Sequence, residues 1–198
     1  MGQRLVVTIQ KNDKEIAKLY YHWSAYSFSA LKETQEIVNC IFNHEDETES
    51  ELLLRLIRFC EANGGGIDGV EEEFQYIQSL YPNEIFKKDG YSRSYGLIAL
   101  SKQGMEEMQA YSEGDMTIDL DEEKIYNGVF SYYESLEEYN SEMQECDEEF
   151  EPKTLDNIPD IGYDLGEIAI SDLDDLLDKL RNVDWTCRYG NEIYELTE

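Results

Sequence analysis

Carboxylates are concentrated in the stretch SYYESLEEYNSEMQECDEEFEP, residues 131–152, which contains nine Asp or Glu residues and no Lys or Arg. Carboxylates at this density are suited to three kinds of chemistry. They can ligate divalent cations, act as a paired acid and base in hydrolysis, or attract a basic macromolecule by their charge. The spacing of these residues and the types of their neighbours distinguish among the three.

The spacing does not predict a metal site. An EF-hand loop needs Gly at its sixth position and Glu at its twelfth, whereas the run DLDEEKIYNGVF that begins at Asp119 has Lys124 and Phe130 there. Cys40 and His44 have the i, i+4 spacing of two ligands on one helix face. A zinc site would need further ligands, such as a closely spaced cysteine pair, but the sequence has no such pair and only one other histidine. We therefore expect no metal ion and no cofactor, with Cys40 packed in the core.

Motifs of nucleophilic or phosphate chemistry are also missing. His22 lies in LYYHWSAY among aromatic residues, which favours packing over a catalytic triad, and the sequence contains no GxSxG. GGGIDG at 64–69 lacks the Lys and Ser or Thr of a P-loop. We predict that the protein is not an enzyme. An alternative stays open, because so many carboxylates are present: a hydrolase that uses carboxylates and a divalent ion at a site without a known motif.

Helical spacing separates charged from apolar residues in the acidic part of the chain. On a helix over 129–145 the glutamates fall on or near one side, and the other side has Phe130, Tyr133, Leu136 and Asn140, with Tyr139 and Met143 at its margin. A helix over 171–182 buries its leucines and leaves its aspartates in water. We expect acidic ridges from about 106–151 and 164–178 to bind a partner, with two tyrosines as aromatic anchors. The predicted partner-binding residues are Glu134, Glu137, Glu138, Glu142, Glu145, Asp147, Glu148, Glu149, Glu151, Asp172, Asp174, Asp175, Asp178, Tyr132 and Tyr139.

The charge is regional, which indicates what kind of partner this is. The net charge is −29, but residues 1–103 have 16 acidic and 11 basic residues, whereas residues 104–178 have 25 acidic residues against Lys124 and Lys153. Direct binding of nucleic acid or an anionic membrane by the acidic part is excluded, because both need basic residues. We expect a basic nucleic-acid-binding protein as partner and leave homo-oligomers open. The boundary predicts a near-neutral α+β half (1–103) and a strongly acidic α+β half (104–198), or one continuous domain.

The order of predicted elements is typical of an α+β fold, with an N-terminal β-hairpin followed by helices, a short mixed sheet and a C-terminal hairpin. Thr48 and Glu51 form a T-x-x-E capping box at the start of a helix. The predicted strands are 4–10, 16–23, 96–101 and 116–121, and the closing hairpin TCRYGNEIYEL turns at Gly190-Asn191. The predicted helices begin at Ser24 or Ser27 and continue over 48–62, 70–81, 102–112, 129–145 and 171–182, the last capped by Ser171.

The opening MGQRLVVTIQKN has an apolar run of roughly five residues, shorter than the core of a secretory leader. No stretch approaches the roughly 20 apolar residues of a membrane span. The four cysteines are far apart in the sequence, which favours reduced thiols. We expect a cytoplasmic protein.

The acidic, aromatic-containing composition resembles that of antirestriction DNA mimics and several anti-CRISPR inhibitors of phages and mobile elements. The segments MGQRLVVTIQKNDKEIAKLYYHWSAYSFSALKETQEIV and YGLIALSKQGMEEMQAYSEGDMTIDLDEE are similar to phage and prophage proteins of Gram-positive bacteria. The resemblance implies an inhibitor in the bacterial host cytoplasm that occupies the basic nucleic-acid-binding surface of a CRISPR or restriction nuclease. The near-neutral first half departs from this pattern, since such mimics tend to be acidic throughout. An acidic structural or adaptor protein of a phage particle is a further alternative.

Overall fold

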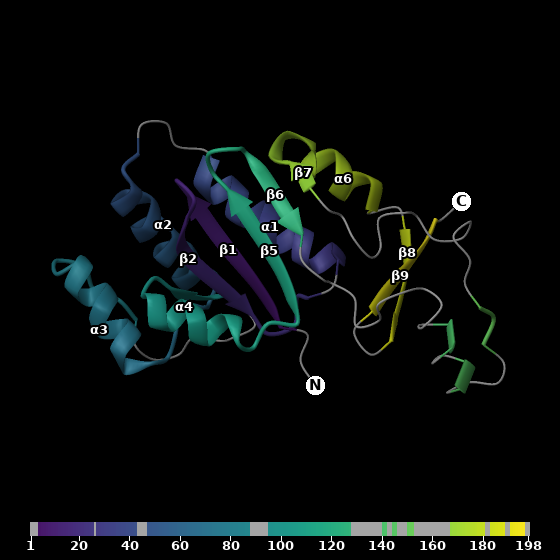
Figure 1. Cartoon of the computed structure of the whole chain (residues 1–198), viewed down its shortest axis with the longest axis horizontal. Helices are drawn as coiled ribbons and strands as arrows, with labels where there is room; N and C mark the ends of the chain where they lie inside the picture. The colour runs from purple at the N-terminus through teal and green to yellow at the C-terminus, as the bar shows by residue number, and fades with distance from the viewer. Residues whose placement is uncertain are drawn as a thin grey trace.

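A seven-stranded mixed sheet in the order β3-β4-β2-β1-β5-β6-β7 forms the centre of the fold (Figure 1). The computed structural model describes residues 4–25, 27–42, 47–87, 95–127, 140–141, 144–145, 150–152, 167–180, 183–188 and 191–196. The strands of this sheet are β1 (Leu5–Lys11), β2 (Lys14–Tyr21), β3 (Gly66–Ile67), β4 (Leu97–Ala99), β5 (Gly114–Asp119), β6 (Lys124–Asn127) and β7 (Glu167–Ala169). A separate two-stranded sheet consists of β8 (Val183–Arg188) and β9 (Asn191–Leu196).

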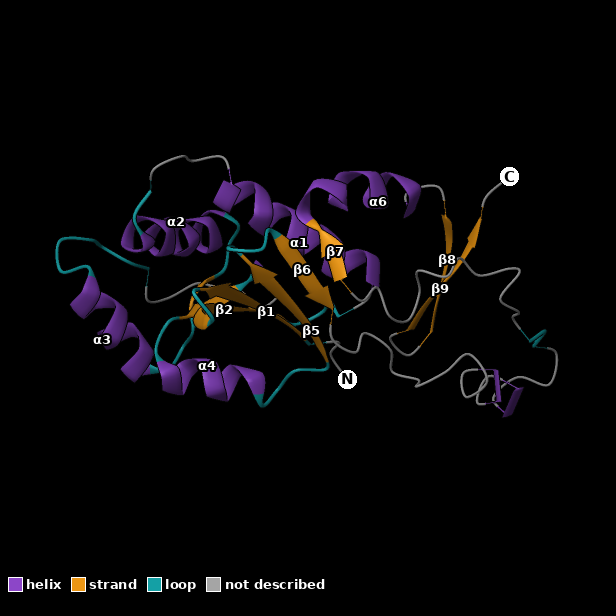
Figure 2. Ribbon diagram, turned by 45° about the horizontal axis from the view of Figure 1, so that its top comes forward, coloured by secondary structure: helices purple, strands orange, loops and turns teal. Residues whose placement is uncertain are grey.

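Helices cover both faces of the large sheet (Figure 2). Helices α1, α2 and α6 lie on one face, where alternate residues of the central strands, such as Val7 and Leu19, join the main core. Helix α4 lies on the opposite face, where Met105 and Met108 pack on Val6 and Tyr20 in a smaller cluster. The helices are α1 (Ser27–Phe42), α2 (Glu49–Ala62), α3 (Glu71–Leu80), α4 (Lys102–Gln109) and α6 (Leu173–Leu180), the last preceded by a 3-10 turn, η2 (Ile170–Asp172).

The N-terminal hairpin forms as predicted. Strands β1 and β2 are antiparallel, and the pairing of Lys11 with Lys14 leaves a two-residue turn. Both turn residues, Asn12 and Asp13, have left-handed φ angles, 53° and 56°. Asn and Asp tolerate this conformation better than most residues, and it gives a turn whose twist matches that of the strands. The predicted α+β class is therefore confirmed, with the hairpin at the middle of the sheet.

Strands from both sides of the charge boundary at residue 103 share this sheet. β1 pairs in parallel with β5, with Leu5 opposite Gly114 and Gln10 opposite Asp119. β5 continues through antiparallel pairs to β6 and β7. The acidic second half thus contributes three strands to the sheet that the near-neutral first half begins.

Capping hydrogen bonds determine where two of the helices begin. The capping box predicted at Thr48 is confirmed, because its hydroxyl accepts from the Glu51 amide and the Glu51 carboxylate accepts from the Thr48 amide. Helix α4 begins after Ser101, whose hydroxyl accepts from the Gly104 amide at 3.0 Å. The buried carboxylate of Glu73, on α3, accepts from the amides of Leu100 and Ser101 at 2.7 and 3.1 Å and also contacts the Ser101 hydroxyl.

Four details differ from the sequence predictions. GGG at 64–66 not only ends α2 but also leads into β3, which pairs with β4. The run KIYN is strand β6, which was not predicted. Ser171 lies inside η2, and its hydroxyl donates to Asp172. Asn191 pairs with Arg188 as the first residue of β9, whereas the predicted turn Gly190-Asn191 included it. The predicted helix over 129–145 is described only at 140–141 and 144–145, which are helical.

Candidate functional site

Exposed carboxylates from three segments gather where β6, β7 and α6 form one edge of the fold, which we call the acidic edge. The turn between β5 and β6 contributes three, β7 one, and η2 with α6 four. All eight residues are exposed. They are Asp121, Glu122, Glu123, Glu167, Asp172, Asp174, Asp175 and Asp178.

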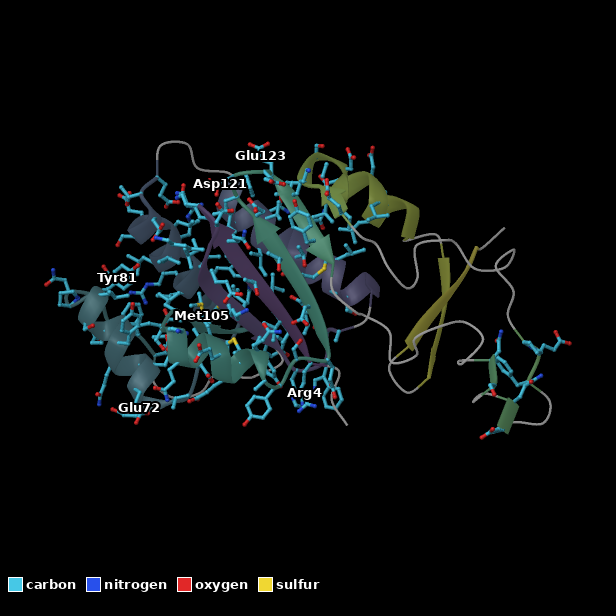
Figure 3. The ribbon with its side chains drawn as sticks, in the orientation of Figure 1. Arg4, Glu72, Tyr81, Met105, Asp121 and Glu123 are labelled. Carbon is cyan, nitrogen blue, oxygen red and sulfur yellow. The ribbon has the colours of Figure 1, made fainter. Side chains whose placement is uncertain are left out.

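Backbone pairing brings these segments together. Glu167 lies opposite Tyr126 in the β6–β7 pair, and the Ile170 amide donates to the Glu123 carbonyl at 3.0 Å, which fixes η2 beside the β5–β6 turn. Helix α6 buries Leu173 and Leu177 and packs against α1, which leaves its aspartates exposed. One of them, Asp174, also accepts a hydrogen bond from the Gln35 side-chain amide of α1. In Figure 3, Asp121 and Glu123 lie along the upper side of the molecule, the side on which Figure 1 labels α6.

Few basic groups balance the acidic edge. The Lys124 ammonium pairs with Glu167 at 2.6 Å and lies 3.6 Å from Glu122. The hydrogen bond to Glu167 raises the pKa of Lys124 above its usual value. Lys179, in α6, is the second basic residue of the segments 121–127 and 167–180, which together contain eight acidic residues. The net charge of the two segments is therefore −6.

The predicted partner-binding residues divide into three groups. The first group lies on the acidic edge and consists of Asp172, Asp174, Asp175 and Asp178. All four are exposed, as the apolar periodicity of 171–182 predicts. Glu145 and Glu151 are exposed. The others lie outside the described residues: Tyr132, Glu134, Glu137, Glu138, Tyr139, Glu142, Asp147, Glu148 and Glu149. Four residues of the acidic edge were not predicted individually, although they fall within the predicted acidic ranges: Asp121, Glu122, Glu123 and Glu167. Their position beside α6 depends on strand pairing.

Metal-ligand types do not converge in the part of the chain that the structure describes, where no three His, Cys, Asp or Glu side chains form a group able to hold an ion. Cys40 is half-buried against the core, as predicted, and Cys60 is fully buried. Burial raises the pKa of both thiols. The two cysteines are therefore protonated packing residues rather than nucleophiles at neutral pH.

A cavity of about 350 Å³ opens on the face of the sheet that carries α4. Its volume is within the range of about 300–1,000 Å³ typical of small-molecule sites. His22, interpreted from the sequence as a packing residue, is half-buried and lines this cavity, and its Nδ1 is 2.8 Å from the Tyr20 hydroxyl. The described lining residues are Arg4, Tyr20, His22, Asp68, Val70, Leu97, Glu107, Met108 and Tyr111.

Arg4, one of the lining residues, forms a salt bridge with Glu113, which is distant from it in the sequence. Arg4 Nη2 donates to Glu113 Oε1 at 2.8 Å, and the Arg4 amide donates to Glu113 Oε2 at 2.9 Å. The side-chain hydrogen bond to Glu113 raises the pKa of Arg4, whereas the pKa of Glu113 is lowered because these bonds outweigh the opposing effect of its burial. Arg4 is thus already paired with a carboxylate outside the lining set.

The half-buried carboxylate of Glu33, on α1, should make stability depend on pH. Burial, reinforced by Glu36, raises the pKa of Glu33 from 4.5 to about 7, although the Ser24 hydroxyl donates to it at 3.2 Å. The folded state therefore holds this proton more tightly than the unfolded chain, so stability should fall as pH rises from about 4.5 to about 7. We expect Glu33→Gln to remove about 2 kcal/mol of this decline, measured by urea unfolding at pH 5 and pH 8.

The exposed Glu49 on α2 supplies the control, because Glu49→Gln should leave the pH dependence of the wild type intact. If wild type and Glu33→Gln lose the same stability between pH 5 and pH 8, Glu33 is not the source of the pH dependence.

No family model matches the chain, and neither curated proteins nor solved structures contain a match to it.

Proposed function

We propose that the acidic edge binds a basic protein surface that normally holds nucleic acid and so competes with DNA or RNA for it. The observation that carries this proposal is the presence of eight exposed carboxylates on the acidic edge, in two segments, 121–127 and 167–180, that contain only two basic residues, Lys124 and Lys179. Mutual repulsion among such charges destabilises the compact state. A basic partner would offset that cost.

The geometry of α6 is compatible with replacing phosphates. Side chains three or four residues apart on a helix, such as Asp174 and Asp178, have Cβ atoms about 5–6 Å apart. Each DNA strand presents one phosphate per about 3.4 Å of axis, which is the same scale. Complementary charge of this kind raises the association rate and makes binding sensitive to salt.

The resemblance to antirestriction and anti-CRISPR proteins extends the proposal to a phage-type inhibitor. In this form the protein acts stoichiometrically in the bacterial host cytoplasm on a defence nuclease of a CRISPR or restriction system. In the described part of the chain, every helix is too short or too polar to cross a lipid bilayer.

A triple substitution on α6 tests the proposal. The variant combines Asp174→Asn, Asp175→Asn and Asp178→Asn. It should bind the partner at least about tenfold more weakly than the wild type, because several charge contacts are lost at once. The tagged full-length chain is used to capture proteins from a bacterial lysate and is eluted with a salt gradient. A supporting partner binds DNA or RNA, is displaced by that nucleic acid, and elutes from the variant at lower salt.

A matched triple on other helices separates position from net charge. The control replaces three exposed glutamates on α2, α3 and α4 by Gln: Glu49, Glu72 and Glu106. It changes the net charge by as much as the triple substitution on α6. This variant should retain the partner. Equal weakening by both triples, or capture unaffected by either, would rule out the acidic edge as the binding surface.

The alternatives predict different results, in an activity assay for the first and in the capture experiment for the second. A hydrolase that needs a divalent ion would show turnover that chelation abolishes and that a single carboxylate substitution removes. A phage structural or adaptor protein would instead assemble with itself or with other particle proteins without displacement by nucleic acid.

A further inference from the structure

The cavity on the face of the sheet that carries α4 has a lining of aromatic and apolar side chains around one guanidinium. Tyr20, His22 and Tyr111 contribute the rings, and Tyr111 is 60% exposed, so a ligand can reach it from solvent. The apolar lining residues include Leu97 and Met108. Rings and apolar side chains of this kind favour a flat ligand that is largely apolar.

Arg4 supplies this lining with hydrogen-bond donors that the protein does not use. A guanidinium has five N–H donors, and that of Arg4 makes one hydrogen bond among the described residues, from Nη2 to Glu113 at 2.8 Å. The buried Nε of Arg4 has no acceptor among these residues. The side chain as a whole is 35% exposed and lines the cavity, which leaves it accessible to a ligand. A ligand that accepts hydrogen bonds would therefore find donors without a partner.

The guanidinium and the rings lie near one another. The side-chain hydrogen bond to Glu113 is the main cause of the raised pKa of Arg4, and the phenol groups of Tyr20 and Tyr111 act electrostatically in the same direction. The cavity thus combines donors and rings as an aromatic ligand with an attached acceptor would need.

The lining carboxylates neither need a cation nor favour an anion. Glu107 accepts from Gln103 of the same helix at 2.8 Å, and Asp68 accepts at 2.8 Å from the backbone amide that follows it. Both remain negatively charged, whereas Arg4, the one Lys or Arg in the described lining, is balanced by Glu113. An anion would be repelled by this excess of carboxylates. An uncharged acceptor, such as a carbonyl group, avoids the repulsion and still accepts from the guanidinium.

We propose that the cavity binds an uncharged aromatic carbonyl compound, whose ring packs on the aromatic side chains and whose oxygen accepts from Arg4. The volume of about 350 Å³ is near the lower end of the range typical of small-molecule sites, which suits a ligand of one or two rings. The occupant is a free small molecule rather than a base of a nucleic acid, because a strand would bring phosphates toward the lining carboxylates. In Figure 3, Arg4 lies on the lower side of the molecule, whereas Asp121 and Glu123 lie along the upper side. The inference is therefore independent of the proposed function.

Three probes of nearly equal size and shape test the preferred charge: benzamide is uncharged, benzoate is an anion and benzamidinium is a cation. Each is titrated into the full-length chain while the amide signals of Tyr20, Leu97 and Met108 are followed by NMR. Benzamide should shift these amides at concentrations at least about fivefold lower than either charged probe. Tighter binding of a charged probe, equal binding of all three, or no shift at all would overturn the proposal.

A fourth probe tests the preference for an aromatic ring. Cyclohexanecarboxamide has the same amide group on a ring that is neither flat nor aromatic. It should bind at least about threefold more weakly than benzamide, because stacking on the lining rings is lost. Equal binding of the two amides would show that the cavity does not recognise an aromatic compound.

Substitution of Arg4 tests the hydrogen-bond donor. Arg4→Met keeps a long side chain but removes the donors, and it should weaken benzamide binding by about tenfold. Because this change also breaks the salt bridge, Glu113→Gln is the matched variant, which removes the negative partner and leaves the guanidinium in place. It should bind benzamide within about threefold of the wild type. Equal weakening by both variants would show that only the salt bridge matters, and the proposal would fail.

Two further variants leave the salt bridge intact, so the test does not depend on the stability of Arg4→Met. Tyr111→Ala removes an exposed ring of the lining and should weaken benzamide binding at least about threefold. Glu106→Gln is the control, since Glu106 is exposed on α4 outside the described lining, and it should change binding by no more than about twofold. Wild-type affinity for benzamide in Tyr111→Ala would contradict the site.

Discussion

Replacing Glu73 by alanine should lower the free energy of unfolding by about 3–5 kcal/mol, because it removes the acceptor of several hydrogen bonds in the protein interior. The Glu73 side chain is 2% exposed. Its carboxylate accepts from the amides of Leu100 and Ser101, at the point where β4 leads into α4. Without the carboxylate, these two N–H groups lose their acceptor, at a cost of about 1–3 kcal/mol each.

The neighbouring glycine shows how closely this carboxylate approaches α4. A Cβ atom on Gly104 would lie 2.3 Å from Glu73 Oε2, so only glycine leaves room for the carboxylate there. The start of α4 is also where the helix dipole favours negative charge. Glu73 therefore links α3 to the N-terminus of α4, and its loss should loosen both helices.

Urea unfolding of Glu73→Ala, Glu73→Gln and Glu72→Ala measures this effect. Glutamine keeps one acceptor oxygen, so we expect an intermediate loss from Glu73→Gln. Glu72 is exposed on the same turn of α3, and its replacement should change stability by no more than about 0.5 kcal/mol. If Glu73→Ala and Glu72→Ala unfold at the same urea concentration, the carboxylate is not structural.

Gly65→Ala should destabilise the fold by more than about 3 kcal/mol, because the added methyl group has no space. A Cβ at position 65 would lie 1.8 Å from the Gly96 carbonyl oxygen and 2.7 Å from that of Tyr95. These are backbone atoms, which cannot turn aside as a side chain can. The Gly96 carbonyl also accepts from the Gly66 amide at 3.0 Å, so relieving the clash would separate β3 from β4.

Thermal unfolding and amide exchange at Gly66 and Asp68 measure the outcome for Gly65→Ala. Both amides should exchange faster in the variant, because they donate to the carbonyls of Gly96 and Ile98 and so join β3 to β4. Asn63→Ala is the control, since Asn63 is exposed and its cap bonds to α2 come from its backbone amide. Unchanged exchange and an unchanged melting temperature in Gly65→Ala would contradict the predicted clash.

Local signals in the sequence predicted the elements that they encode directly. The alternation before and after the KNDKE turn predicted the first hairpin, and the T-x-x-E motif at Thr48 predicted the start of α2 to the residue. The leucines of 171–182 predicted the buried side of α6, and with it the four exposed aspartates of the acidic edge. In each case the residues that carry the signal are neighbours in the sequence.

Elements that depend on distant partners were missed. β3 is two residues long and follows a glycine run that by itself indicates only the end of a helix, and β6 lies within an acidic run. Both are strands because of the strands beside them, β4 for one and β5 and β7 for the other. The cavity was missed for the same reason, because its lining residues come from segments as far apart in the sequence as Arg4, Asp68 and Tyr111.

The parallel pair of β1 and β5 has a consequence for how the chain reaches its fold. β1 is an inner strand, yet one of its two neighbours is β5, which begins at Gly114. Contacts of such long sequence separation raise the contact order, and closing the loop between them costs conformational entropy before the contacts are gained. Until β5 arrives, the hydrogen-bonding edge of β1 stays open to strands of other chains. The near-neutral half is therefore the part most exposed to aggregation during synthesis, because most carboxylates of the later half follow β5 and can keep chains apart only after they too have been made.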